Sequence, residues 1–348
     1  MNVTTHERPG VYSSYDASAA VSGGGGRLVG LVGVNTKAAA NTVYTVTGYE
    51  QALTLFGTGT MAELIRLALL NGAAGVVAAA AASTAGYETA FALLEKEENI
   101  CVMLCDSADA VVHGKLKTSV DSASAARRER IAVVGAAEGE SVSQLTARAA
   151  ALNHQRMVLV GPGGVDASGE AASGVTLAAA VGGAIAAMSD PAVPLGGQEL
   201  RGLNGVSQQY SDNDIDLLVR GGVTPLESVS GTVSVVRGIT TRTKTGDTGD
   251  RTWRELSTVL VVDDVIPSVR SALRSKFSRA KNTPQSRGAI RAQVVLELEN
   301  KLSREIITAY DNVTVTEKAD DPTVCLVEFS FTAAHGLNQI WLTAHITV

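Results

Sequence analysis

The alternation of apolar runs with helical patterns between residues 87 and 189 constrains the fold more than any other feature of this 348-residue chain. Apolar runs at ICVMLCD (100–106), IAVVGA (131–136) and MVLVGPGG (157–164) are each followed by a stretch with helical character. Continuous apolar runs of this length are typical of strands buried on both faces, and strands that alternate with helices form parallel βαβ units. The pattern predicts a mostly parallel α/β body whose sheet is covered on both faces.

Single residues indicate where several helices of this body begin or end. Ser141 is a suitable N-cap for a helix over 141–153. Pro191 stops a small-residue helix over 176–189, and a further helix is expected over roughly 108–128. The remaining expected elements are strands at 27–34, 42–46 and 75–82, helices at 48–57 and 61–73, and a helix followed by a hairpin across 211–238.

The last hundred residues follow a different pattern. The polar segment RTKTGDTGDRT (242–252) is the best candidate for an inner domain boundary. Residues 258–277 are interpreted as a strand that runs into a helix, with Asp263 or Asp264 as the cap and Pro267 in the first turn. The pair Asp263-Asp264 has an alternative interpretation as paired catalytic carboxylates, but a cap before a helix explains it without a further role.

A long helix is expected over 286–310, followed by three strands. Apolar residues recur every fourth position along the helix, at Ile290, Val294, Leu298, Leu302 and Ile306. Period-two alternation predicts strands at 312–318, 323–333 and 338–348. The expected fold class is therefore α/β, α+β overall, with a mostly parallel α/β body, an α+β C-terminal domain and extended strand arms at both ends.

Both ends of the chain are interpreted as arms. Residues 1–22 contain Pro9-Gly10 and no long apolar pattern, and they are followed by a flexible joint made of Gly23, Gly24, Gly25 and Gly26. At the other end, alternate apolar residues from Ile340 to Val348 share one face. An open strand with this pattern is a hazard unless its edge meets a partner.

Composition and charge exclude several function classes. A net charge of -6 argues against a general nucleic-acid binder, which would carry a basic excess. No segment has the order of a signal peptide, and none is long and apolar enough to cross a bilayer, so no direct membrane binding is expected. Three cysteines without metal-ligand spacing indicate synthesis in a reduced, intracellular compartment.

The motifs of catalysis are incomplete. The segment GITTRTKT (238–245) has Thr243 where a phosphate loop requires glycine, and GPGGVDASG (161–169) has Asp166 where a dinucleotide fingerprint requires glycine. The five histidines lack metal-pair spacing, and His113 and His154 are expected on helix surfaces or ends. No catalytic residue, cofactor or metal site is predicted. A nucleotide-dependent α/β enzyme with a doubly wound sheet remains the alternative function, and a monomeric binding module is a third.

One local charge cluster contrasts with the acidic chain. Seven basic residues without an intervening acid are Arg270, Arg274, Lys276, Arg279, Lys281, Arg287 and Arg291. Three interpretations are open: a solvated helix face followed by a loop, a docking surface for an acidic partner, or a weaker nucleic-acid contact. The nucleic-acid interpretation is disfavoured because no aromatic residues are interleaved.

Four segments carry a resemblance to a known family. They are ERPGVY (7–12), RLVGLVGVNTKAAANTVYTVTGYEQALTLFG (27–57), NGAAGVVAAA (71–80) and VSVVRGITTRTKTGDTGDRTWRELSTVLVVDDV (233–265). In order and spacing they resemble the tail sheath proteins of contractile phage tails and related contractile injection systems. The chain is short for a sheath protein and has little room for extra outward-facing domains. Residues 87–189 match the family by pattern more than by residue.

The resemblance implies a mechanical role. Sheath subunits assemble as stacked hexameric rings around an inner tube, and their arms add strands to the sheets of neighbours. It implies these partners: other copies of the chain, the inner tail tube protein, and baseplate and tail terminator proteins, with no nucleic acid and no cofactor. The particle is a virion tail or injection device, synthesised and assembled in the cytoplasm of a bacterial host.

The resemblance also assigns roles along this sequence. The expected domains are a linking arm with its hinge (1–26), a small α/β subdomain (27–86), an outer α/β body (87–245) and an inner, tube-facing domain (246–348). The expected strand-exchange residues are Val11, Tyr12, Ile340, Trp341, Leu342, Ala344 and Ile346. The expected tube-facing basic surface consists of Arg270, Arg274, Lys276, Arg279 and Lys281.

Overall fold

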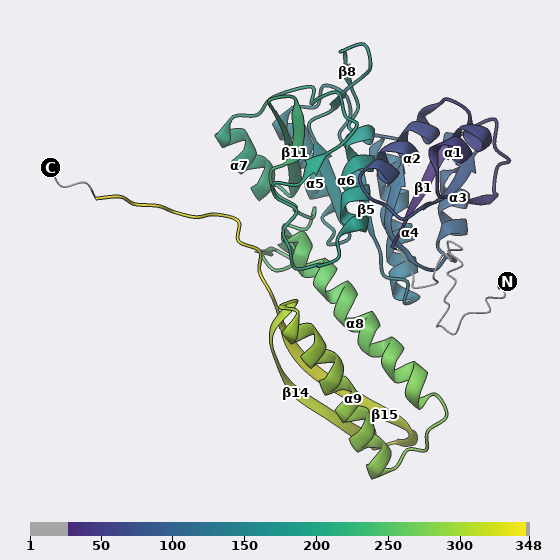
Figure 1. Ribbon diagram of the computed structural model, residues 1–348, viewed down its shortest axis with the longest axis vertical. Coiled ribbons are helices and arrows are strands. Elements are labelled where there is room, and N and C mark those ends of the chain that lie inside the picture. Colours follow the sequence, from purple (N-terminus) through teal and green to yellow (C-terminus); the bar gives the residue numbers. More distant parts are fainter. Residues whose placement is uncertain (1–26, 346–348) are drawn as a thin grey trace, which may run out of the picture.

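The computed structural model describes residues 27–345 of the chain. The expected N-terminal arm, including Val11, Tyr12 and the glycine hinge Gly23–Gly26, lies outside the described residues, and so does Ile346. The described chain forms a large α/β body, a smaller module beneath it, and an extended C-terminal segment (Figure 1).

A nine-stranded sheet forms the centre of the body within the described residues, in the order β2-β3-β1-β4-β5-β6-β10-β11-β9. The six strands from β3 to β10 in this order are parallel to one another. At the two edges, β2 is antiparallel to β3 and β11 is antiparallel to β10, while β9 is antiparallel to β11 and so runs in the direction of the six. The predicted fold class is confirmed. The strands are Leu28–Val34 (β1), Val43–Val46 (β2), Val76–Ala81 (β3), Ile100–Cys105 (β4), Ile131–Gly135 (β5), Met157–Gly161 (β6), Glu199–Leu200 (β9), Val223–Val229 (β10) and Thr232–Val235 (β11).

Helices cover both faces of the sheet, and each face has its own apolar core. Helices α1, α2 and α6 belong to one core, and α3, α4, α5 and α7 to the other. Close packing between α2 and α6 depends on Gly183, because a Cβ there would lie 2.4 Å from the backbone oxygen of Ala68. The helices are Tyr49–Phe56 (α1), Thr60–Leu70 (α2), Tyr87–Leu94 (α3), Ala110–Ala125 (α4), Val142–Leu152 (α5), Val175–Ala187 (α6) and Asp212–Arg220 (α7).

The C-terminal module consists of α8 (Leu256–Phe277), α9 (Pro284–Ser303) and a hairpin of β14 (Ile307–Lys318) and β15 (Asp321–Ala333). Figure 1 shows α8 running down from the body, with α9 and the hairpin beside its lower part. A third apolar core joins these elements. Its main members are Val261, Val265 and Val269 of α8, Val294 and Leu298 of α9, and Ile307 and Val313 of β14.

Two expectations for this module are wrong. Residues 258–262 are helical, so α8 is continuous, Asp263 and Asp264 lie inside it and cap nothing, and Pro267 is internal rather than in the first turn. Burial explains the helix, because Val259 and Leu260 pack in the body core while Val261 packs in the module core. Burying each such side chain contributes roughly 1.5–3 kcal/mol, against helix-propensity penalties of under about 0.7 kcal/mol per β-branched residue.

The helix expected to reach residue 310 ends at Ser303 instead. Glu305 adopts a left-handed φ of 58°. The Glu305 N–H then bonds to Leu302 O and the Ile306 N–H to Lys301 O, which is the pattern that closes a helix. Ile306 therefore continues the apolar stripe spatially without being helical, and β14 starts at the next residue.

Other local predictions have mixed outcomes. Ser141 caps α5 as predicted, and Gln144 completes a capping box. His113 is fully buried in α4, so its predicted surface position is wrong, while His154 follows α5 and pairs with Asp121 at 2.9 Å. Among the helices of residues 27–345, none combines the length and apolar character that crossing a bilayer requires.

Candidate assembly surfaces

The chain leaves β15 and continues from residue 334 to residue 345 as an extended tail, which points away from the body (Figure 1). It passes Pro194 at Gly336, where a Cβ atom would lie 2.7 Å from the proline Cβ. Ile340, Trp341 and Leu342 are 79%, 89% and 90% exposed. Consecutive large apolar side chains with this exposure are typical of interaction surfaces. The strand predicted at 338–348 is not formed over its described part, residues 338–345, in the single chain.

The β14–β15 hairpin is a two-stranded sheet within the described residues, so both of its outer edges are open. One face packs on the module core, and Phe329 and Phe331 on that face stack at 6.3 Å between ring centroids. Both phenyl groups remain partly exposed, because two strands do not cover them. An open edge offers unpaired N–H and C=O groups to an added strand.

Ion pairs fix α8 to the body and to its own module. Arg156, at the end of the loop before β6, donates two hydrogen bonds to Asp263, at 2.6 and 2.8 Å. Arg270 donates to Glu129 at 2.7 Å. Burial is the largest single effect and raises the pKa of Glu129, but the hydrogen bond from Arg270 and the charges of Arg270 and Arg156 together outweigh it and hold that pKa below its ordinary value. Inside the module, Lys301 contacts Asp264 at 2.6 Å.

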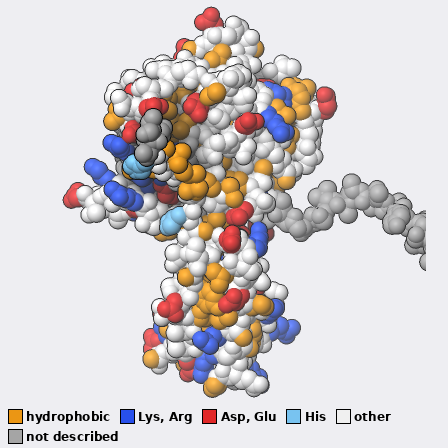
Figure 2. Space-filling model, turned by 60° about the vertical axis from the view of Figure 1, so that its left-hand side comes forward, with side chains coloured by type: hydrophobic (Ala, Val, Ile, Leu, Met, Phe, Trp, Pro, Cys, Tyr) orange, Lys and Arg blue, Asp and Glu red, His pale blue; other side chains and the backbone are white. Residues whose placement is uncertain are grey.

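The predicted basic surface divides into two parts. Arg274, Lys276, Arg279 and Lys281 are exposed along the distal end of α8 and the loop after it. Lys276 donates to Gln293 on α9 at 2.6 Å. Arg270 does not belong with these cations, because Glu129 neutralises it. Figure 2 shows basic and acidic side chains intermingled on the module surface that faces the viewer.

The crevice that a nucleotide-dependent enzyme would use is filled by the chain's own side chains. The direction of the strand order changes between β1 and β4, and ligands of doubly wound sheets bind at the carboxyl ends of such strands. Here Asp106 accepts a bond from Val34 N at 2.8 Å and another from the Tyr87 hydroxyl. Burial raises the pKa of Asp106. A Cβ at Gly33 would lie 2.7 Å from Met61 Cγ, so this end of the sheet is closely packed.

The segment 238–245, which partly resembles a phosphate loop, is also occupied by internal contacts. Thr240 and Thr241 are fully buried and hydrogen-bonded. The backbone N–H groups of Thr243 and Lys244 both donate to Asn153, so they do not form a free anion cradle. Across the described residues, no cluster of three or more His, Cys, Asp or Glu side chains is arranged to hold a metal ion.

Two sequence profiles of one family match this chain. The profile described as "Phage tail sheath protein central domain" matches residues 80–241, and the one described as "Phage tail sheath C-terminal domain" matches residues 248–347. The chain belongs to the phage tail sheath family. The family is structural rather than enzymatic, and the resemblance stated from sequence is confirmed.

Relatives and solved structures agree with the family. The tail sheath protein of Bacillus phage SP01 is 27% identical over 260 residues, which are 73% of this chain and 44% of that protein. The chain thus spans less than half of this relative's length. The sheath tail protein of Desulfitobacterium hafniense has a TM-score of 0.70 at 12% identity, covering 93% of this chain and all of that one. The contracted helical sheath of the anti-feeding prophage has a TM-score of 0.74 at 14% identity, covering 98% and 99%.

The structure places the predicted sheath residues in three situations. Ile340, Trp341, Leu342 and Ala344 lie on the exposed tail. Four of the five expected tube-facing cations lie at the distal end of α8 and in the loop after it, whereas Arg270 is paired. Sequence reasoning missed the ion pair between Arg156 and Asp263, although an acid within the apolar run TVLVVDDVI was a signal that it needed a buried partner.

Proposed function

We propose that this sheath protein polymerises as stacked hexameric rings around an inner tube and contracts to drive the tube through a target envelope. The observation that carries the proposal is the exposed apolar tail together with the open β14–β15 hairpin. In one chain the apolar tail has no sheet to pair with, and the hairpin has open strand edges. In a polymer, the tail of one copy can add a strand to the hairpin of another, which covers the tail and closes the edge.

Strand addition between copies is the proposed linkage. The twelve residues from 334 to 345 reach about 40 Å when extended, which is enough to leave one subunit and enter the next. Alternate residues Ile340, Leu342 and Ala344 share one face, as an added strand over a half-covered apolar layer requires. The N-terminal arm, with Val11 and Tyr12, is proposed as a second linking strand, and Gly23–Gly26 as its hinge.

The distal end of α8 is proposed as the tube-facing surface. Arg274, Arg279 and Lys281 are exposed, and within the described residues none of them forms an ion pair. An acidic tube would meet these cations through screened contacts that a rotating subunit can release. Under this proposal residues 246–348 form the inner domain, 87–245 form the outer body and 27–86 form a small α/β subdomain, and baseplate and terminator proteins bind the two ends of the polymer.

Truncation tests the strand linkage. We expect chains lacking residues 1–22, residues 339–348 or both to remain folded but to stay small in sedimentation velocity, while the complete chain forms polymers. Ile340→Ser with Leu342→Ser keeps the tail length and should also block assembly. Val229→Ser, at another exposed apolar residue that is 59% exposed, is the matched control and should assemble normally. Sheath-like tubes formed by the doubly truncated chain in electron micrographs would refute strand exchange.

Charge reversal tests the tube-facing assignment. Arg274→Glu with Arg279→Glu should weaken co-assembly with the tube protein while leaving the circular dichroism spectrum unchanged. The control reverses Lys96 and Arg201, two exposed cations of the body, and alters the net charge equally. Equal co-assembly of both variants with the tube would show that α8 does not face it.

A further inference from the structure

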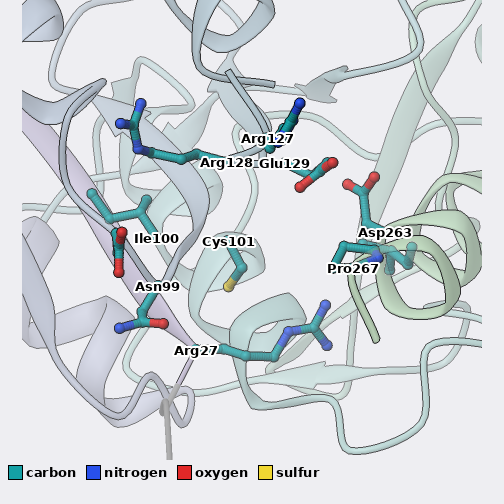
Figure 3. A pocket seen from close by; sticks show the side chains of 11 residues that line it. Arg27, Asn99, Ile100, Cys101, Arg127, Arg128, Glu129, Asp263 and Pro267 are labelled. Atoms are coloured by element: carbon teal, nitrogen blue, oxygen red, sulfur yellow. The ribbon is translucent and has the colours of Figure 1, made fainter. Parts of the chain in front are cut away.

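A cavity of about 410 Å³ opens beneath the body, between the amino ends of the parallel strands and α8. Arg27 precedes β1, Cys101 lies in β4, and Arg127 to Glu129 precede β5, so neighbouring strands bring these residues together. Figure 3 shows Arg27 along one side, Arg127 and Arg128 on the opposite side, and Cys101 between them. Asp263 and Pro267 of α8 form the remaining wall.

The cavity lining carries an excess of positive charge, because most of its acidic side chains are in ion pairs and its arginines are not. Glu129 is neutralised by Arg270, and Asp263 by Arg156. Within the described residues Arg27, Arg127 and Arg128 form no ion pair, and Glu98 is the unpaired acid that remains among the lining residues. Arg27 and Arg128 donate to the backbone oxygens of Met188 and Glu95, which hold the two guanidinium groups in place.

Helix α7 carries the opposite charge at the opposite edge of the sheet. It precedes β10 and runs antiparallel to it, so its first turn lies at the carboxyl edge of the parallel strands, whereas the cavity lies at their amino edge. Asp212 and Asp216, one turn apart, are exposed beside Leu217, which is 55% exposed. The partner of Asp216 is Arg220, in a solvent-exposed pair that adds little. Figure 1 shows α7 at the outer edge of the body.

We propose that the cavity receives α7 of a second copy of this chain, with Asp212 and Asp216 against the arginines and Leu217 in the apolar part near Pro267. The inference rests on the proposed polymer and names one of its contacts. Helix α7 packs beside α5 and β10, whereas the cavity lies at the amino ends of β1, β4 and β5, so the α7 of a chain does not reach that chain's own cavity. A head-to-tail contact of this kind leaves each copy with one free surface of each sign, and it therefore propagates into rings or helical arrays.

Charge complementarity selects this occupant. The cavity walls offer at least two cations more than unpaired anions, and α7 offers two carboxylates with an exposed leucine at adjacent positions. The contact strengthens orientation and register between copies, because wrong pairings would place like charges together. It also weakens with added salt, since its charges lie near solvent.

Reciprocal charge reversal tests the contact in the full-length chain. Asp212→Lys with Asp216→Lys, and separately Arg127→Glu with Arg128→Glu, should each raise the critical concentration for polymer formation on the order of tenfold or more, because like charges then face each other. The chain with all four substitutions should assemble near the unmodified critical concentration. The control, Glu138→Lys with Glu170→Lys, changes charge equally at two exposed acids elsewhere and should have little effect.

Each outcome separates the contact from its alternatives. Recovery in the fourfold variant supports it, and normal assembly of both double variants refutes it. Impaired double variants without recovery also refute it, because the cavity would then bind a different segment, such as residues 1–22. Leu217→Ser preserves charge and, if the reversed chains fail to fold, still decides the question by its effect on critical concentration. If the unmodified chain does not polymerise, the proposed function itself fails.

Discussion

Replacing Asp263 with alanine is expected to destabilise the sheath protein strongly by freeing α8 from the body. The Asp263 and Arg156 side chains are 9% and 14% exposed, and two hydrogen bonds of 2.6 and 2.8 Å join them. Removing the carboxylate leaves the buried guanidinium without its counter-charge, which costs about 3–5 kcal/mol in comparable pairs. With a urea m-value of about 3 kcal/mol/M, the unfolding midpoint should fall by roughly 1–2 M.

Urea unfolding followed by Trp253 fluorescence measures this effect, because Trp253 packs partly against the body core while Trp341 is already exposed. Asp216→Ala is the matched control. Its pair with Arg220 has side chains 62% and 72% exposed, and its loss should cost under about 1 kcal/mol.

A double variant, Asp263→Leu with Arg156→Met, distinguishes a broken charge pair from lost packing. It should be more stable than Asp263→Ala, because no unpaired charge remains buried. The reasoning is refuted if Asp263→Ala costs no more than Asp216→Ala, or if the double variant is the less stable one.

Three further predictions concern the cores and the thiols. Burial lowers the pKa of His113 to about 4, so the unfolded chain binds more protons between pH 6.5 and 4, and stability should fall as pH falls through that window; His113→Gln should flatten this slope in urea titrations. Burial raises the pKa of Cys105 to about 12, so a thiol reagent should label Cys325 first and Cys105 only on unfolding; early labelling of Cys105 would contradict its burial. Leu298→Ala should cost about 2–5 kcal/mol, whereas Leu296→Ala, on the same helix but 50% exposed, should cost under about 0.5 kcal/mol by thermal unfolding.

Sequence patterns predicted the structure correctly where a single effect, such as burial or helix capping, determines the local conformation. Strands β5 and β6 are buried on both faces, so their sequences are continuously apolar and flanked by helical stretches. Ser141 predicted the start of α5 correctly, because a capping hydroxyl accepts a hydrogen bond from a backbone N–H within the first turn of the helix. The apolar alternation of residues 338–345 was also readable, although the strand that it predicts is not formed in the single chain.

Sequence patterns failed where two structures compete for the same residues. The run TVLVV is apolar at every position, so periodicity does not distinguish a buried strand from a buried helix. The run is helical because it lies between two cores: Val259 and Leu260 pack in the body core and Val261 packs in the module core. A helix directs successive side chains in several directions, so it reaches both cores. The left-handed turn at Glu305 was equally invisible, because it depends on where β14 must start against α9.

The sequence by itself determined the parallel body, the family of the chain and the unsatisfied apolar tail, because these depend on local patterning and on burial that repeats along the chain. The tertiary structure alone decided which charges are free. Asp263 and Arg270 are neutralised by residues more than a hundred positions away, whereas Arg127 and Arg128 form no ion pair among residues 27–345. Ion pairing depends on distances in space, and those distances are fixed only once the strands and α8 have packed together.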